Sequence, residues 1–332
     1  MKHCFKGVLM LHDYIEIVIY NPPLLQSFQQ EVSLRSKRRT YPQMHEQQPI
    51  MKCFICSNEK EFSLRNYPQS NSNPILKFTQ IAECNVCDIC FAIPQYSQSQ
   101  LDNYYSGCMY WTNSSKNLSN YHYYQSFERV EKTLPFLTEK RDLNILDIGA
   151  GLGMQRKVLS RTICNFNYFF IEPDDNLAAS ISKEKKTFRL ESVDQAKVKF
   201  DFIYISHVLE HVANPVAFLQ QIKSVLKKDG HIYIETPNAD DQFKDDVFPH
   251  CTFFTLDTLR KTIAHSGFKA IKCNSFGSKK SILTPSIIDR IKSKIASNIN
   301  FHFPRVLLNR SRYKLHHNDH EGIWIYAIIK ND

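Results

Sequence analysis

Residues 144–153 (NILDIGAGLG) combine a short apolar run with three closely spaced glycines. The run 144–148 predicts a strand buried on both faces, and residues 154–161 predict the helix that follows it. Gly149, Gly151 and Gly153 permit positive φ angles and let a ligand approach the backbone. The helix N-terminus behind them offers free N–H groups and the positive end of its dipole. This stretch therefore predicts a site for a nucleotide-like cofactor.

Two acidic residues and the elements after them narrow this prediction. A glycine turn alone is weak evidence, because nicotinamide and flavin domains use similar glycines. Asp147 lies two residues before the first glycine, and Glu172 directly follows a second apolar run, 168–171. An acid in the position of Glu172 binds the hydroxyls of a ribose. The further predicted elements are a strand over 200–206, a helix from 214 and a strand over 231–235.

Four of the ten cysteines form two Cys-x-x-Cys pairs, Cys53 with Cys56 and Cys84 with Cys87. Each pair suits a knuckle whose thiolates point at one metal ion, and two knuckles give a tetrahedral zinc site. Four protein ligands leave no open position, so the expected zinc is structural. Cys90 forms an overlapping pair with Cys87 and could replace it as a ligand. A redox dithiol and unmetallated cysteines are the alternatives.

Three histidines, His207, His211 and His250, follow predicted strands at the edge where open α/β sheets bind ligands. Histidine titrates near neutral pH and is a common general base. We therefore expect a histidine from this group to remove a proton from the substrate, although His211 and the preceding Glu210 could instead hold their loop in place. His207 and His211, at i, i+4, could also hold a metal ion, but the sequence shows no third ligand for it.

These residues resemble class I S-adenosylmethionine (SAM) methyltransferases, in the branch that carries Val-Leu-Glu-His-Val and Leu-Lys-x-x-Gly. The two motifs are residues 208–212 and 226–230 here, and the resemblance covers roughly residues 144–271 with a closing strand at 322–329. It implies an α/β fold with a Rossmann-like doubly wound sheet whose last strand is antiparallel, preceded by a small N-terminal zinc ribbon. It also implies SAM as the cofactor.

The resemblance further implies the residues of the cofactor site, which are Asp147, Gly149, Ala150, Gly151, Gly153, Glu172, Pro173 and Ser206. The glycine turn would face the methionine part of SAM, Glu172 the ribose, and Pro173 with Asp174 the adenosine. Residues 191–193 follow the third strand, where the family contacts adenine. His250 begins a stretch similar to the family's His-x-x-Phe-Phe.

The N-terminal segment resembles the zinc-binding segment of some sugar methyltransferases. In those proteins a Cys-x-x-Cys-Gly knuckle leads to an aromatic residue, a proline and a Leu-x-x-Tyr-Tyr stretch; the corresponding residues here are Phe91, Pro94 and 101–105. Asp88 replaces the usual glycine, so the knuckle geometry is expected to differ. Sugar rings stack on aromatic faces, which makes Tyr104, Tyr105 and Tyr110 second-rank substrate contacts beside their role in a core.

The chain is expected to have four parts. Residues 1–50 form an extension that is either disordered or upstream of the true start at Met51. Residues 51–100 form the zinc ribbon, 101–140 an aromatic-rich helical cover, and 141–332 the methyltransferase domain with a basic insertion at about 276–320. Within that insertion, isoleucines at helical spacing predict a basic amphipathic helix over 285–299. It would act as a lid on an anionic substrate or as a peripheral membrane contact, or it would simply dock on the domain.

The sequence thus predicts a SAM-dependent methyltransferase for a small acceptor, with a nucleotide- or lipid-linked sugar of a surface glycan as the expected class. The formal net charge of +9 favours anionic partners. One alternative is an RNA methyltransferase that uses the ribbon and the positive charge to hold phosphates. It is disfavoured because Ser206-His-Val-Leu209 stands where many base N-methyltransferases carry Asn/Asp-Pro-Pro-Tyr. The other alternative, a non-catalytic module, is disfavoured by the intact glycines and Glu172.

The cysteine pairs also bear on the compartment, because paired thiols beside this fold suit a reducing environment. The sequence has no transmembrane run and no signal peptide pattern. A cytoplasmic location is therefore expected, with contact at the inner membrane face through residues 285–299. Oligomeric state is not predicted.

Overall fold

The computed structural model describes residues 51–68, 76–107, 125–137, 142–279, 315–316 and 320–332. All of them belong to the second of two compact units, Ile50–Asp332. The predicted extension at 1–50 and the predicted helix at 285–299 lie outside the described residues. Among the described residues, no helix has the length and hydrophobicity needed to cross a bilayer.

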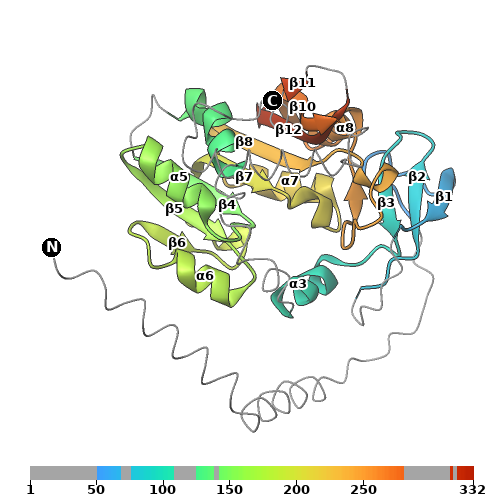
Figure 1. Cartoon of the computed structure of the whole chain (residues 1–332), viewed down its shortest axis with the longest axis horizontal. Helices are drawn as coiled ribbons and strands as arrows, with labels where there is room; N and C mark the ends of the chain where they lie inside the picture. The colour runs from blue at the N-terminus through green and yellow to red at the C-terminus, as the bar shows by residue number, and fades with distance from the viewer. Residues whose placement is uncertain (1–50, 69–75, 108–124, 138–141, 280–314, 317–319) are drawn as a thin grey trace, which may run out of the picture. The chain divides into compact units, whose positions relative to one another are not determined.

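An eight-stranded sheet forms the centre of the unit, in the order β11-β10-β12-β8-β7-β4-β5-β6 (Figure 1). The strands from β8 to β6 are parallel, whereas β12, β10 and β11 are antiparallel. Their bounds are β4 Leu143–Ile148, β5 Phe166–Ile171, β6 Thr187–Arg189, β7 Phe200–Ser206, β8 Leu226–Pro237, β10 Phe268–Lys279, β11 Leu315–His316 and β12 Gly322–Asn331. The predicted Rossmann-like sheet with antiparallel closing strands is confirmed.

Two apolar cores cover the two faces of this sheet, as expected for strands buried on both sides. Along β4, Ile145 contributes to one core, while Leu146 and Ile148 contribute to the other. Helices α5 (Met154–Thr162) and α6 (Asp175–Ile181) and the helical residues 125–133 pack on the Ile145 side. Helices α7 (Pro215–Lys223) and α8 (Leu256–His265) pack on the other side. The sheet is thereby wound on both faces.

The N-terminal cysteine segment forms a second, smaller sheet in the order β1-β2-β3-β9. Three of its strands are β1 Phe62–Asn66, β2 Gln80–Cys84 and β3 Cys90–Ile93, and α3 (Gln98–Gly107) follows them. The fourth strand, β9 (Thr252–Phe253), comes from the segment between β8 and α8 and pairs with β3. This pairing, which joins the ribbon to the loop that carries His250, was not predicted from the sequence.

Strand β8 begins five residues earlier than the sequence predicts. The predicted strand covered residues 231–235, whereas the motif residues Leu226–Gly230 before it also lie within β8. The pairing of β8 with β7 shifts register between Phe200 and Phe202. At Gly230 an added Cβ would lie 2.9 Å from the carbonyl oxygen of Phe200. The residues before His231 therefore form a bulge in β8. A glycine at this point permits the close approach of two backbones.

Tyr67 ties the ribbon to the His250 loop and generates the first prediction. Its hydroxyl donates to the carbonyl oxygens of His250 (3.0 Å) and Val247 (3.4 Å). Tyr67→Phe removes these bonds and should lower the free energy of unfolding by about 1 kcal/mol. It should also speed hydrogen exchange at residues 247–251. Urea unfolding and mass-resolved hydrogen exchange would measure both effects.

Tyr96→Phe is the matched control, because the Tyr96 hydroxyl bonds to the backbone of Lys77 within the ribbon. It should leave exchange at 247–251 unchanged. Equal exchange in the two variants would show that Tyr67 does not hold the loop.

Candidate functional site

The glycine turn sits at the carboxyl end of β4, held against the end of β5. Gly149 and Ala150 donate their N–H groups to the carbonyl oxygen of Ile171, at 2.8 and 3.2 Å. Gly149 has a φ of +72°, and a Cβ there would lie 2.5 Å from Val208 Cγ2. Gly151 has a φ of +53° and open space where a Cβ would be. At Gly149 both the positive φ angle and the lack of space for a Cβ require glycine. At Gly151 the lack of a side chain leaves the backbone open to a ligand.

Two carboxyl groups flank the turn. Glu172 accepts backbone N–H groups from Gly151 (2.7 Å) and Asp174 (3.0 Å), so its orientation is fixed before any ligand arrives. Burial raises the pKa of Glu172, and this effect outweighs the two hydrogen bonds, which lower it. Burial likewise raises the pKa of Asp147 to about 7, against a hydrogen bond from the Tyr168 hydroxyl. Both groups are held in a low-dielectric environment that strengthens their interaction with a bound cation or hydroxyl.

A cavity of about 1230 Å³ opens at this edge of the sheet. Its size exceeds the roughly 300–1,000 Å³ of a typical ligand pocket, so SAM and a second small molecule fit together. The predicted site residues that line it are Asp147, Gly149, Ala150, Gly151, Glu172, Pro173, Ser206, His207, His211 and His250. Residues 191–193 and Tyr105 line it as well. The structure thus brings together the predicted glycine, acid and histidine groups.

Two predicted residues do not line the cavity. Gly153 has a φ of +66° at the N-cap of α5 and packs against Ile181, where a Cβ would lie 2.8 Å from Cγ1. Gly153 does not line the cavity, and its neighbour Ile181 belongs to helix α6. Tyr104 is buried beside Leu76 and Leu101 in a small apolar core. Tyr110 lies outside the described residues.

His207 lies between two carboxylates. The register of β7 and β8 sets Ser206 beside Glu235, so the next residue reaches that side chain: His207 Nε2 is 3.1 Å from Glu235 Oε1. On its other side, His207 Nδ1 is 3.3 Å from Glu210 Oε1. Burial acts to lower the pKa of His207, but Glu210 and Glu235 outweigh it and raise this pKa to about 9. At neutral pH His207 is therefore protonated and cannot accept another proton.

A buried ion pair fixes the Glu235 side of this contact. Arg129, on the helical residues 125–133, forms a bidentate pair with Glu235 at 3.1 and 2.7 Å. The Tyr233 hydroxyl donates to the same carboxylate at 2.6 Å. Burial acts to raise the pKa of Glu235, but Arg129 and His207 hold it well below its usual range. Sequence reasoning missed Arg129, which also lines the cavity.

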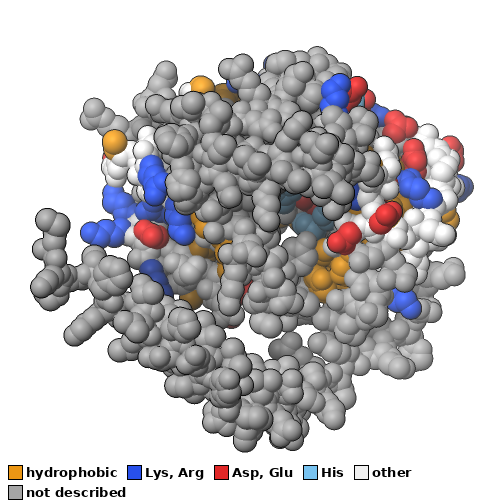
Figure 2. Space-filling view, in the orientation of Figure 1, with side chains coloured by type: hydrophobic (Ala, Val, Ile, Leu, Met, Phe, Trp, Pro, Cys, Tyr) orange, Lys and Arg blue, Asp and Glu red, His pale blue; other side chains and the backbone are white. Residues whose placement is uncertain are grey.

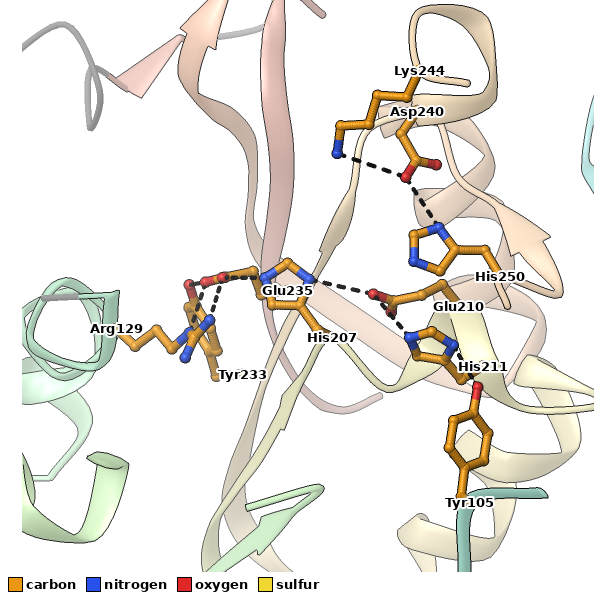
Figure 3. A network of polar contacts seen from close by, with 10 residues as sticks. All are labelled: Tyr105, Arg129, His207, Glu210, His211, Tyr233, Glu235, Asp240, Lys244 and His250. Atoms are coloured by element: carbon orange, nitrogen blue, oxygen red, sulfur yellow. Dashed lines mark hydrogen bonds and ion pairs between the residues drawn. The ribbon is translucent and has the colours of Figure 1, made fainter. Parts of the chain in front are cut away.

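His211 and His250 lie on the far side of Glu210 (Figure 3). His211 comes from the short helix η3 (Leu209–His211), and the Tyr105 hydroxyl of α3 lies 2.8 Å from its Nδ1. His250 precedes β9, and its Nδ1 lies 3.0 Å from Asp240 Oδ2. Burial lowers the pKa of His211 to about 4 against the attraction of Glu210, so this ring is neutral at neutral pH.

Histidine side chains are visible on one face of the molecule. Figure 2 shows histidine side chains near the middle of the molecule in this view, with acidic and hydrophobic atoms beside them.

Sequence reasoning treated Glu210 as a loop-holding residue and gave no role to Asp240. A signal for Glu210 existed in its motif with His211, whereas nothing in the local sequence marks Asp240 as a partner of His250.

The four predicted cysteine ligands also meet. Their sulfur atoms all lie within 4.8 Å of one another, with Cys53 and Cys87 at 3.4 Å and Cys56 and Cys84 at 3.5 Å. A tetrahedral site with Zn–S bonds of about 2.3 Å needs sulfur atoms about 3.8 Å apart, so the group fits zinc. Cys90 does not belong to the group; its thiol faces the Asp88 carbonyl oxygen at 3.8 Å. The Cys90 alternative is therefore not supported by the geometry.

Comparisons with known proteins bear on the domain around this cavity. Residues 121–272 match a family model described as a methyltransferase domain. The chain is 28% identical over 169 residues to the uncharacterized protein MJ0638 of Methanocaldococcus jannaschii, covering 49% of this chain and 72% of that protein.

It is also 26% identical over 147 residues to the tRNA U34 carboxymethyltransferase of Campylobacter lari, covering 41% of this chain and half of the Campylobacter protein. A solved SAM-dependent methyltransferase from Archaeoglobus fulgidus is 19% identical, with a TM-score of 0.44 over 63% of this chain and 94% of that one. Together with the sheet and its glycine turn, the family match shows that this part of the chain is a class I SAM-dependent methyltransferase domain.

Proposed function

We propose that the enzyme transfers the methyl group of SAM to a small polar acceptor bound beside the histidine cluster. The observation that carries this proposal is the single cavity lined by the glycine turn, Glu172 and the three histidines. Glu172 would hold the ribose hydroxyls, and Asp147 with the backbone of the glycine turn would face the methionine part. Pro173, Ser206 and residues 191–193 would border the nucleoside.

The acceptor class that we propose is a nucleotide- or lipid-linked sugar. Its support is the resemblance of residues 84–105 to the zinc-binding segment of sugar methyltransferases, together with the size of the cavity. Incubation with radiolabelled SAM and a panel of nucleotide-sugars would test it. Transfer of label to a sugar supports the class; a panel that leaves SAM turnover unchanged contradicts it.

The chemistry is a displacement at a sulfonium. An acceptor atom loses a proton and attacks the methyl carbon of SAM, while the carbon–sulfur bond breaks with its electron pair moving to sulfur. The products are the methylated acceptor and S-adenosylhomocysteine. The enzyme contributes in-line alignment and a destination for the proton.

The proton would leave toward the histidine cluster, although the three rings differ in what they offer. His207 already carries a proton between Glu210 and Glu235. His250, held by Asp240 at 3.0 Å, has the arrangement in which a carboxylate orients an imidazole. His211 is neutral and adjoins His250, with ring centroids 4.9 Å apart. We propose His250 and His211 as the rings nearest the reacting atoms, with His207 orienting the acceptor.

Zinc at Cys53, Cys56, Cys84 and Cys87 is proposed as a structural ion. All four positions around it would be filled by thiolates, which leaves none for a substrate. Burial raises the pKa of the Cys53 thiol to about 11, and a bound zinc ion would favour its thiolate form. The ribbon carries the strand that pairs with β9, so the ion would stabilise the His250 loop at a distance.

RNA is the second candidate acceptor. One similar protein is a tRNA U34 carboxymethyltransferase, and the net charge of +9 suits a polyanion. A steep fall of RNA affinity with rising salt, together with label transfer to RNA, would favour this acceptor over a sugar.

The role of Glu172 can be tested through cofactor affinity. Glu172→Gln loses the charged acceptor for the ribose hydroxyls, and the Kd for S-adenosylhomocysteine should rise about 10- to 100-fold. Calorimetric titration measures this change, and thermal unfolding reports whether the variant is folded. Glu184→Gln removes an exposed acid outside the cavity and should leave the Kd unchanged. A Kd in Glu172→Gln equal to that of the wild type would contradict the assignment.

The cysteine group can be tested through metal content. The wild-type chain should carry about one zinc ion, and Cys53→Ser should lose most of it and unfold at a lower temperature. Cys90→Ser changes a neighbouring thiol that is not in the group and should keep its zinc. Elemental analysis after gel filtration measures the content. Full zinc in Cys53→Ser, or none in the wild type, would show that the four thiols do not hold the ion.

A further inference from the structure

A second group of metal-ligating side chains lies in the wall of the cavity, far from the cysteines. Glu210, His211 and His250 each offer one donor atom, and these atoms lie within 4.8 Å of one another. Two of the residues are adjacent on η3, whereas His250 arrives on the loop before β9 (Figure 3). The backbone N–H of Cys251 donates to the carbonyl oxygen of Glu210 at 2.7 Å, which fixes the two segments against each other.

The outer nitrogen of each histidine faces a polar partner, although the His250–Asp240 contact is a close approach without hydrogen-bond geometry. Nδ1 of His211 lies 2.8 Å from the Tyr105 hydroxyl, and Nδ1 of His250 lies 3.0 Å from Asp240 Oδ2. The other nitrogen of His211, Nε2, lies 4.0 Å from Glu210 Oε1, and the second nitrogen of His250 points away from Asp240 toward Glu210. Histidines that bind metals generally hold their other ring nitrogen in this way, because the outer contact sets tautomer and orientation.

The Glu210 carboxylate is buried and shares its nearest basic side chain with a second carboxylate. It is 1% exposed, and neither oxygen accepts a hydrogen bond from a described residue. The nearest basic side chain is that of His207, at 3.3 Å, which also lies 3.1 Å from Glu235. A buried carboxylate is costly unless it is paired or binds a metal ion.

We infer that Glu210, His211 and His250 bind a divalent transition-metal ion whose remaining coordination positions open into the cavity. Two imidazoles and one carboxylate with open positions suit zinc, manganese or ferrous iron. Glu210 and Asp240 supply negative charge around the ion, while Lys244, 3.9 Å from Asp240, lies on the outer side.

This site differs from the pair that sequence spacing suggested. His207 and His211 share the i, i+4 spacing, but His207 faces both carboxylates and is not in the group. The second histidine ligand instead comes from His250, 39 residues after His211. Only the folded chain brings it there.

The ion has a catalytic consequence that rests on the proposed function. An acceptor hydroxyl bound at an open position would lose its proton at lower pH, and the proton would pass to solvent water in the cavity. Coordination would then replace direct proton transfer to His250 or His211. The alkoxide oxygen would attack the methyl carbon of SAM as described above.

Manganese binding to the full-length, zinc-loaded chain tests the inference. Free Mn²⁺ gives an electron paramagnetic resonance signal that binding removes, and the cysteine site disfavours manganese because its ligands are soft thiolates. The wild type should bind about one Mn²⁺, and Glu210→Gln and His250→Gln should lose it. Asp240→Asn should weaken binding about 10- to 100-fold, because the outer partner of a ligand is lost. His265→Gln, on the exposed end of α8, is the matched control and should bind as the wild type does.

Each outcome decides the inference. Wild-type protein that binds neither Mn²⁺ nor a second zinc ion overturns it, as does unchanged binding in Glu210→Gln and His250→Gln. S-adenosylhomocysteine titration of the same samples reports whether each variant is folded. It also separates the two proposals. Metal binding without cofactor binding would defeat the proposed function alone. Cofactor binding and methyl transfer by a protein that binds no second ion would defeat the metal site alone.

Discussion

The buried Glu210 carboxylate is the contact on which the site depends. Its main chain accepts the N–H of Cys251, and its side chain faces His207, His211 and His250. Burial acts to raise the pKa of Glu210, but His207, His211 and His250 lower it to about 2. A carboxylate that stays charged in the interior requires cationic or polar partners around it. The three histidines are among these partners.

The small cysteine sheet contributes to this site from outside it. Strand β9 joins that sheet through β3, and the Tyr67 hydroxyl reaches the carbonyl oxygen of His250. Arg65 of β1 forms an ion pair with Asp241, the neighbour of the residue that contacts His250. The ribbon is therefore a support for the loop between β8 and α8. A chain that loses order at the cysteines is expected to lose the position of His250 as well.

The parts of the fold that could be predicted are those set by local sequence. The strand, glycine turn and helix at 144–162 are adjacent in the chain, and the apolar periodicity of each element is visible without tertiary contacts. The cysteine pairs gather as their spacing predicted, because two knuckles converge on one point. The cavity also contains Glu172 at the expected end of β5.

What could not be predicted depends on contacts between distant segments. Arg129 meets Glu235 across 106 residues, and Asp240 meets His250 only because β9 joins the ribbon sheet. The expectation that His207 serves as a base took account of its place after a strand, but not of Glu235 on the neighbouring strand, which favours its charged form. The predicted strand over 231–235 was shorter than β8, because the polar residues before it join the sheet only through a register shift with β7 that local sequence does not show.

A crystal structure of the full chain with S-adenosylhomocysteine tests the central claim most directly, because it locates the reacting sulfur relative to the histidine cluster. The account predicts the ribose hydroxyls at Glu172, the homocysteine part along the glycine turn, and the sulfur facing the cavity wall formed by Glu210, His211 and His250. A sulfur directed away from that wall, or a ligand bound outside this cavity, would contradict it.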